Sequence, residues 1–349
     1  MLFKKKGLLG LDIGSSSIKI AEVIVGKKGH TLQNFGLIPT PPQATSGGDI
    51  VDANLLVETI RHLLTEIKTK NKNTVTGLWG ASVIVKRISI PRMEEALIAD
   101  QIRWEAEQYI PYDINEVHLD YKILKVTPSD SDTMDILLIA AVQEMIFNCA
   151  EIVTASGLTC VVLDVEGFAL ANCFEANYGV LHGELLGLLN IGSSVTNFVV
   201  VEDGEVIFCR DIPMGGLTYT NELAKSLGLS MTEAEGIKLA VGSGQAVPEE
   251  AGAVIESTHE TVIEEINGSI EFFNNTNSGA TLSRLFLTGG GSKTTGLFQA
   301  ISQVLPCERF NPFQTVKASG RAFSEPYINQ IRDYSAISMG LSLRTLGDS

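Results

Sequence analysis

The sequence predicts an α/β fold made of two related halves, and three observations predict it. The tetrapeptide Ile-Gly-Ser-Ser occurs at residues 13–16 and again at 191–194. Each copy follows an apolar run and precedes an alternating segment, which is the pattern of a strand, a tight turn and a second strand. Amphipathic helical patterns follow in both halves. Asp12 and Asn190 precede the two turns and are 178 residues apart (190 − 12), so the repeat is about half the chain and not a solenoid period.

The bulk composition is that of a globular protein and excludes several classes. With 349 residues, 44% hydrophobic and 19% charged, the chain can bury the cores of two domains. A formal net charge of −15 disfavours nucleic acid and anionic lipid as main partners. No apolar run approaches the roughly 18 residues of a membrane span, so we expect a cytoplasmic protein that reaches a membrane only through a partner. Five cysteines without C-x-x-C spacing and five scattered histidines indicate free thiols and no zinc site.

The first Gly-Ser turn has residue types that suit phosphate and magnesium. Glycine lets a backbone approach a ligand closely, and successive N–H groups with neighbouring hydroxyls make an anion cradle. Asp12 ends the first strand, where its carboxylate can hold a hydrated Mg²⁺ against phosphates. An ordinary hairpin without a ligand has the same pattern. The candidate residues are Asp12 (metal, through water), Gly14, Ser15, Ser16, Ser17 and Lys19.

Two further glycine-containing segments extend this candidate site. The second turn, facing the first across a cleft, could hold the β- and γ-phosphates of a nucleotide from the other side. A third cluster follows a short apolar strand and precedes a helix, and bare glycine backbone there suits phosphate or a flat adenine ring, although an ordinary βα turn looks alike. The chain has neither a P-loop nor a G-x-G-x-x-G motif. The candidate residues are Asn190, Gly192, Ser193, Ser194 and Thr196 in the second turn, and Gly289, Gly290, Gly291 and Ser292 in the third cluster.

An α+β unit is expected to be inserted into the first half. A helix over 94–109 stops before Pro111, strands follow over 117–126 and 134–142, and a second helix ends at Gly157. The buried face of this second helix is expected to carry Met145, Cys149, Ile152 and Val153. Before the insertion, a loop is expected over 39–48. In the second half, Ser230 and Glu233 fit a capping box at the start of a helix, and the long helix is expected over 258–273. The resulting domains are 1–85 plus 159–183 for the first domain, 86–158 for the insertion, and 184–349 for the second domain.

The order of these motifs resembles that of the actin-like ATPase superfamily. More specifically, the chain resembles the PilM family of type IV pilus assembly proteins, which is similar to the cell-division protein FtsA. The phosphate turns identify only the superfamily, whereas the segment Trp-Glu-Ala-Glu-Gln-Tyr-Ile-Pro is specific to the family. The matching stretches are 10–23, 88–91, 102–111, 162–166 and 336–344.

The resemblance implies an actin-like ATPase (ribonuclease H-like) fold of two related domains with an FtsA-like inserted 1C subdomain, binding ATP and Mg. It places Glu235 and Lys238 on the ribose hydroxyls and assigns the turn at Gly215 and Gly216 to the same site. It also makes Glu166 the candidate for positioning the attacking water. From the residues alone, the first pair is equally an ordinary i, i+3 ion pair, and Glu166 is equally a helix-capping carboxylate.

The resemblance further implies a cytoplasmic ATP-binding scaffold of the pilus inner-membrane complex. It would bind the N-terminal cytoplasmic tail of the membrane protein PilN in a groove between the first domain and subdomain 1C, and nucleotide would set the angle between the domains. Other pilus components and self-association are left open. Any ATP hydrolysis is expected to be slow, because Asn190 stands where many members of the superfamily have Asp.

Two alternative functions are kept. A phosphotransferase, such as a sugar or acetate kinase, would need a general base aimed at a substrate hydroxyl, and the sequence has no obvious Asp-centred motif for one. Turnover of a panel of sugars would identify it. A filament-forming actin homologue would be recognised by nucleotide-dependent light scattering.

Overall fold

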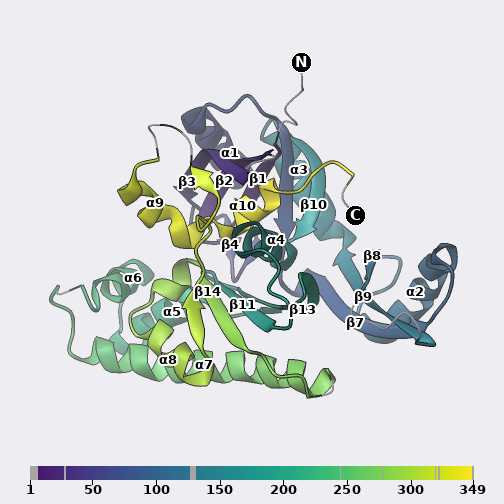
Figure 1. Ribbon diagram of the computed structural model, residues 1–349. Helices are drawn as coiled ribbons and strands as arrows, with labels where there is room; N and C mark the ends of the chain where they lie inside the picture. The colour runs from purple at the N-terminus through teal and green to yellow at the C-terminus, as the bar shows by residue number, and fades with distance from the viewer. Residues whose placement is uncertain are drawn as a thin grey trace.

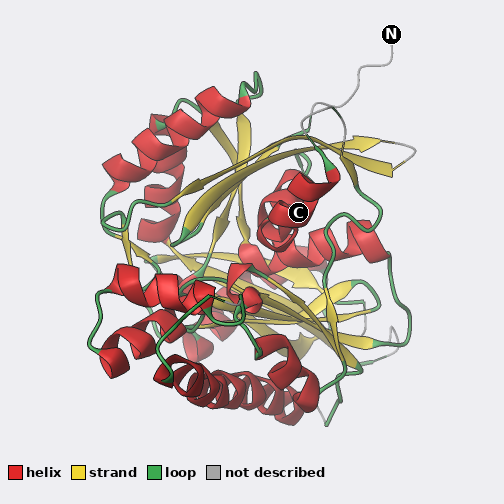
Figure 2. Cartoon of the chain, turned by 90° about the vertical axis from the view of Figure 1, so that its left-hand side faces the viewer, coloured by secondary structure: helices red, strands yellow, loops and turns green. Residues whose placement is uncertain are grey.

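The computed structural model describes residues 7–26, 29–125, 131–243, 245–277, 279–318, 320 and 323–347. Two lobes lie one above the other, each with a central sheet, and a third, smaller sheet projects to one side (Figure 1). Figure 2, turned by 90°, shows the two layers of strands with helices around them. The first lobe holds the first glycine turn, and the second lobe holds the other two glycine segments.

The first sheet is a meander extended by parallel strands. Its order is β10-β6-β1-β2-β3-β16, formed by Thr159–Val165, Asn73–Leu78, Leu9–Ile13, Ser17–Gly26, Gly29–Pro39 and Lys317–Ala318. All five residues of β1 are buried, because helices cover both faces of the sheet at its centre. Helix α1 (Ala53–Ile67) is capped by Asp52, whose carboxylate accepts hydrogen bonds from the amides of Asn54 and Leu55.

The second sheet repeats the first. Its order is β13-β12-β11-β14-β15, formed by Glu205–Ile212, Thr196–Glu202, Leu185–Ile191, Arg284–Thr288 and Cys307–Arg309. The hairpin β11–β12 has the register of the hairpin β1–β2: Asn190 lies opposite Asn197, as Asp12 lies opposite Lys19. Each hairpin also has a parallel neighbour, β14 or β6. The repeated tetrapeptide therefore marks a repeated structural unit.

A third sheet and two helices occupy most of the segment expected as an insertion, 86–158, and this division stays a prediction. The sheet has the order β7-β9-β8, formed by Val83–Pro91, Thr133–Val142 and Val117–Ile123. Helix α2 (Glu95–Tyr109) buries Ile98, Ile102 and Ala106 on this sheet. Helix α3 (Gln143–Ala155) buries the predicted face and packs on the first lobe. The strand expected over 117–126 ends at Ile123, and residue 126 lies outside the described residues.

The helices of the second lobe differ from expectation mainly at their ends. They are α5 (Gly216–Leu227), α6 (Met231–Ala240), α7 (Glu250–Thr276) and α8 (Leu297–Val304). The predicted capping box at the start of α6 is present, with Ser230 and Glu233 bonded reciprocally. Helix α7 begins at Glu250, eight residues before the expected start at Thr258 (258 − 250), so the prediction of its N-terminus was wrong. The residues 39–48, expected to be a loop, include the first strand of a small hairpin, β4 (Thr45–Ser46) with β5 (Asp49–Ile50).

The C-terminal segment returns to the first lobe. Strand β16 pairs with β3, and after α9 (Glu325–Ile331) the last helix, α10 (Ala336–Ser342), packs between β1 and helix α4 (Glu166–Tyr178). Two glycines make this approach possible: a Cβ on Gly10 would overlap the carbonyl oxygen of Ser338, and one on Gly340 would overlap that of Ala169. The domain division at residue 184 stays a prediction. In the structure, β16 and α10, which follow residue 184, pack on the first lobe.

The tight packing of α10 predicts an asymmetry between two Gly→Ala substitutions. Gly340→Ala should lower the free energy of unfolding by about 1–3 kcal/mol, because the added methyl group overpacks a fixed backbone contact. Gly268 is exposed in α7, and an added Cβ there meets nothing within 4 Å. Gly268→Ala should raise the free energy of unfolding by about 0.5–1 kcal/mol, since alanine favours helix. Urea unfolding measures both, and two equal shifts would contradict the packing described.

Candidate nucleotide-binding site

The predicted glycine segments of the second lobe meet at one point. The carbonyl oxygen of Gly192 accepts a hydrogen bond from the amide of Gly216 at 2.9 Å. A Cβ on Gly215, or one on Gly291, would lie only 2.5 Å from that oxygen, so both positions need glycine. The turns that contain Gly192, Gly215 and Gly291 therefore form one continuous wall of bare backbone, as a phosphate cradle requires.

The predicted pair of Glu235 and Lys238 lies beside this wall. The Nζ atom of Lys238 donates to Glu235 Oε2 at 2.7 Å and to the carbonyl oxygen of Gly216 at 3.0 Å. The Lys238 side chain is 10% exposed and that of Glu235 is 44% exposed, so the carboxylate is the member open to solvent. Thr220, which the sequence analysis did not single out, donates to Glu235 Oε2 at 2.5 Å and accepts from Lys238 at 2.9 Å. Its only signal is its position four residues after Gly216.

The first turn carries the charged version of the hairpin. Asp12 is 5% exposed, and its Oδ2 atom lies 3.3 Å from Lys19 Nζ on the facing strand. Burial raises the pKa of the Asp12 carboxyl, and Lys19 partly opposes this. A Cβ on Gly14 would lie 2.9 Å from the backbone carbonyl oxygen of Ser17, so this turn too is closed to larger residues. Thr40, which no pattern in the sequence indicates, fixes the turn because its hydroxyl donates to the carbonyl oxygen of Gly14 at 2.6 Å.

Glu166 lies between the two hairpins. It is the first residue of α4, directly after β10, and its Oε2 atom accepts a long hydrogen bond, 3.4 Å, from Asn197 Nδ2 on β12. Burial raises the pKa of Glu166 well above its ordinary value, and the charges of Asp12 and Asp211 raise it further. Since Asp12 belongs to the first hairpin and Asn197 to the second, the two turns flank this carboxyl from opposite lobes.

A chain of amides links the second hairpin to the first lobe. Asn190 Nδ2 donates to Asn197 Oδ1 at 2.7 Å, and Asn197 Nδ2 donates to Asp211 Oδ1 at 2.8 Å. The other oxygen of Asp211 accepts from the amide of Gly80 at 2.6 Å. Burial raises the pKa of Asp211. Asp211 was missed in the sequence, because its partner is 131 residues away and no local spacing indicates the contact.

Two orphaned hydroxyls favour a polar ligand at this site. Within the part of the chain that the structure describes, the side-chain oxygens of Ser194, in the second turn, and of Thr288, immediately before the third glycine cluster, are buried without a hydrogen-bond partner. Buried hydroxyls are normally paired, so these atoms fit a ligand rich in acceptors. Within the described residues, no group of three or more His, Cys, Asp or Glu is arranged to hold a metal. A Mg²⁺ ion at Asp12 would therefore take its other ligands from water and phosphate.

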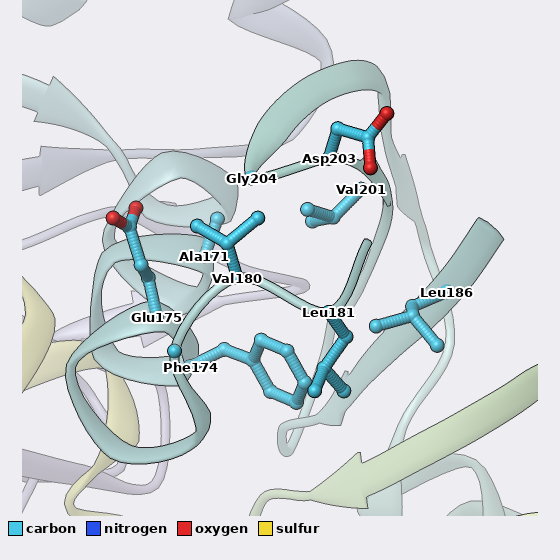
Figure 3. Close-up of a pocket in the computed structure, with 10 residues that line it drawn as sticks. Ala171, Phe174, Glu175, Val180, Leu181, Leu186, Val201, Asp203 and Gly204 are labelled. Atoms are coloured by element: carbon cyan, nitrogen blue, oxygen red, sulfur yellow. The ribbon is translucent and has the colours of Figure 1, made fainter. Parts of the chain in front are cut away.

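Hollows also lie among the described residues. The crevice in Figure 3 lies at the C-terminal end of α4, among Phe174, Val180 and Leu181, and encloses about 10 Å³, room for about one water molecule. A larger cavity of about 200 Å³ lies between the first lobe and the start of α3. It is lined by Gly48, Asp49, Ile50, Trp79, Ala81, Ser82, Val142, Glu144, Met145 and Asn148.

The described part of the chain contains no helix that is both long enough and apolar enough to cross a membrane.

Comparisons with known proteins identify the fold. The chain is 25% identical over 269 residues to the cell division protein FtsA of Bacillus subtilis (strain 168), covering 67% of this chain and 58% of FtsA. Two solved structures resemble it at the level of fold: EutJ of Carboxydothermus hydrogenoformans (TM-score 0.57, 18% identity, 96% and 89% of the two chains covered) and MreB5 of Spiroplasma citri bound to ADP (0.52, 11%, 97% and 95%). The chain therefore has the predicted actin-like ATPase fold.

A third solved structure and a family model point to one family. The chain matches the PilM–PilN type IV pilus biogenesis complex with a TM-score of 0.87 and 29% identity, covering 98% of this chain and 99% of that chain. The model of the type IV pilus assembly protein PilM matches residues 10–346, a range that includes every stretch on which the resemblance was based. The chain belongs to the PilM family of type IV pilus assembly proteins.

Proposed function

We propose that this chain is an ATP-binding scaffold that holds MgATP between its two lobes. The observation that supports this best is the placement of Glu166 between two matched hairpins, one of which closes against the bare backbone of Gly215 and Gly291. In this proposal the two Gly-Ser turns bind the phosphates, and Asp12 holds Mg²⁺ through water. The ribose lies at Glu235 and Lys238, and the third cluster, 289–292, lies against the base.

The same site favours holding nucleotide over rapid hydrolysis. Glu166 is the candidate for positioning a water molecule, and burial together with the charges of Asp12 and Asp211 raises its pKa. Asn190 adds no negative charge at the second turn, where it pairs with Asn197 instead. Magnesium supplies charge neutralisation at the phosphates when bound, and the chain's own groups orient the ligand and exclude water. We therefore propose at most a slow, Mg-dependent ATPase.

The proposed partner is the N-terminal cytoplasmic tail of PilN. A solved structure that matches this chain over 98% of its length, with 29% identity, is a PilM–PilN complex. The cavity of about 200 Å³ lies where the groove between the first domain and the insertion is expected. Its apolar lining includes Ile50, Trp79 and Met145, and carboxylates at Asp49 and Glu144 flank it. This chemistry suits an extended tail with apolar and basic side chains. Through PilN, the chain would lie at the cytoplasmic face of the inner membrane.

Asp12→Ala and Asn190→Ala should affect MgATP binding unequally. Asp12→Ala should abolish it, because it removes the carboxylate that holds the hydrated metal, whereas Asn190→Ala should only weaken it. Isothermal calorimetry with MgATP measures both. With EDTA in place of Mg²⁺, the loss caused by Asp12→Ala should disappear. An unchanged MgATP affinity for Asp12→Ala would contradict the proposed metal site.

Glu166→Gln should stabilise the protein near neutral pH. Because folding raises the pKa of Glu166, the folded protein binds this proton more tightly than the unfolded chain, in which the group titrates near 4.5. The stability of the wild type should therefore fall as the pH rises from 4.5 through the folded-state pKa. The Gln variant does not lose stability in this way, so its greater stability relative to the wild type should vanish below pH 4.5. Urea unfolding over a pH series tests this, with Glu175→Gln on the exposed face of the same helix as the control.

Met145→Ala should weaken binding of a synthetic PilN tail peptide about tenfold, since a buried methionine contact contributes on the order of 1–2 kcal/mol. Fluorescence anisotropy of the labelled peptide measures the dissociation constant. Leu239→Ala is the matched control, because this side chain is 70% exposed on α6 and does not line the cavity. It should leave the dissociation constant of the peptide unchanged. Equal effects of the two substitutions would place the peptide elsewhere.

A further inference from the structure

Strand β13 is the edge strand of the second sheet, and it carries a carboxylate near each end. Glu205 and Asp211 each accept a hydrogen bond from a backbone amide outside the second lobe. Lys125, just after β8, donates to Glu205 Oε2 at 2.6 Å, and Gly80, just after β6, donates to Asp211 Oδ2 at 2.6 Å. Both carboxylates thus hold main chain of the first half against the second lobe, and bonds of this charge-assisted kind are about twice as strong as neutral ones.

Other contacts hold the third sheet to the second lobe. Figure 1 shows β13 next to β7. Leu137 of β9 and Leu124, just after β8, are buried within the core of the second lobe, not within that of the third sheet. Lys122 Nζ lies 3.7 Å from Glu205 Oε1 on β13, and Arg87 Nη1 donates to Asn277 Oδ1 at the end of α7 at 3.3 Å. The third sheet cannot move relative to the second lobe without breaking these contacts.

One of the two segments that β13 holds, the one at Gly80, also borders the larger cavity. Trp79 and Ala81 lie on either side of Gly80 in sequence, and both line that cavity. The indole N–H of Trp79 donates to the carbonyl oxygen of Gly48 at 2.9 Å. Val195, in the second phosphate turn, packs against the apolar cluster of the first lobe that contains Trp79, and a Cβ built on Gly48 would lie 3.5 Å from its side chain. This wall of the cavity therefore lies beside the second turn. Two segments, at Gly48 and at Trp79, are therefore shared by the cavity and the lobe interface.

We infer that β13 couples the nucleotide site to the peptide cavity. This inference rests on the proposed function and concerns how its two ligands influence one another. A nucleotide that draws the second turn toward the first lobe fixes the contacts of Asp211 with Gly80 and of Gly48 with the turn. Those contacts shape one wall of the cavity. MgATP and the peptide therefore bind with positive cooperativity, and by linkage each tightens the other by the same factor.

The test measures that factor in the full chain. The dissociation constant of a synthetic PilN tail peptide is determined with and without saturating MgATP, and that of MgATP with and without the peptide. In the wild type we expect both to tighten by one common factor, between about 5-fold and 150-fold. Asp211→Asn should reduce the factor to about twofold or less, because an amide cannot accept from both Gly80 and Asn197 as the carboxylate does. The ratio is read within each variant, so a change in either basal affinity does not affect it.

Three further variants make the test specific. Asp203→Asn changes an exposed carboxylate in the β12–β13 turn, at the end of the hairpin away from Asp211, and should keep the wild-type factor. Glu205→Gln changes the carboxylate at the other end of β13, which bonds to Lys125, and Trp79→Phe loses the bond to Gly48. Each should reduce the cooperativity factor. They also serve if Asp211→Asn does not fold, which thermal unfolding reveals.

The possible outcomes separate this inference from the proposed function. In one outcome the wild type binds each ligand alone but shows a cooperativity factor near one, and in another MgATP weakens the binding of the peptide. Either result overturns the coupling and leaves the scaffold proposal standing. If every folded variant keeps the wild-type factor, β13 is not the coupling element. If neither ligand binds alone, the proposed function fails and the coupling fails with it.

Discussion

The carbonyl oxygen of Gly192 is the point on which the site depends. It is approached from one side by the backbone at Gly215 and Gly216 and from another by Gly291, at distances that leave no room for a side chain. Only bare backbone allows three segments from distant parts of the chain to meet there. Helix α5, the third glycine cluster and the second hairpin are positioned by this contact, and the Glu235–Lys238 pair follows from it because Lys238 bonds to Gly216.

The two hairpins share a backbone geometry but not a charge. The cross-strand pair is a carboxylate with an ammonium in the first hairpin and two neutral amides in the second. A buried ion pair offers a hard oxygen for a cation, whereas an amide pair offers hydrogen bonds without charge. Under the proposed function, the first hairpin supplies the oxygen for the metal, and the second joins the lobes, since Asn197 also bonds to Glu166. This division suits a protein that holds nucleotide and changes shape with it.

Local patterns predicted much of this structure. The repeated tetrapeptide predicted the duplicated hairpins, the third glycine cluster was placed correctly after a strand, and Ser230 with Glu233 marked a helix start. Hydrogen bonds between distant residues left no such trace. Thr40 and Asp211 act on partners 26 and 131 residues away, and neither stands in a recognisable spacing. The start of α7 was missed because the apolar periodicity of its first turns is weak, although tertiary packing of Ala251 and Ile255 holds them.

The position of α10 has a consequence for biosynthesis. The hydroxyl of Ser342 donates to the carbonyl oxygen of Leu8 and accepts from the amide of Val23, across 334 and 319 residues. Strand β1 is thus covered by a helix that is synthesised long after it, although its strand neighbours β2 and β6 follow it early. The second lobe has all its strands once residue 309 has emerged, so it can fold on the nascent chain before α10 is made. Until α10 is made, the face of β1 that it covers stays exposed.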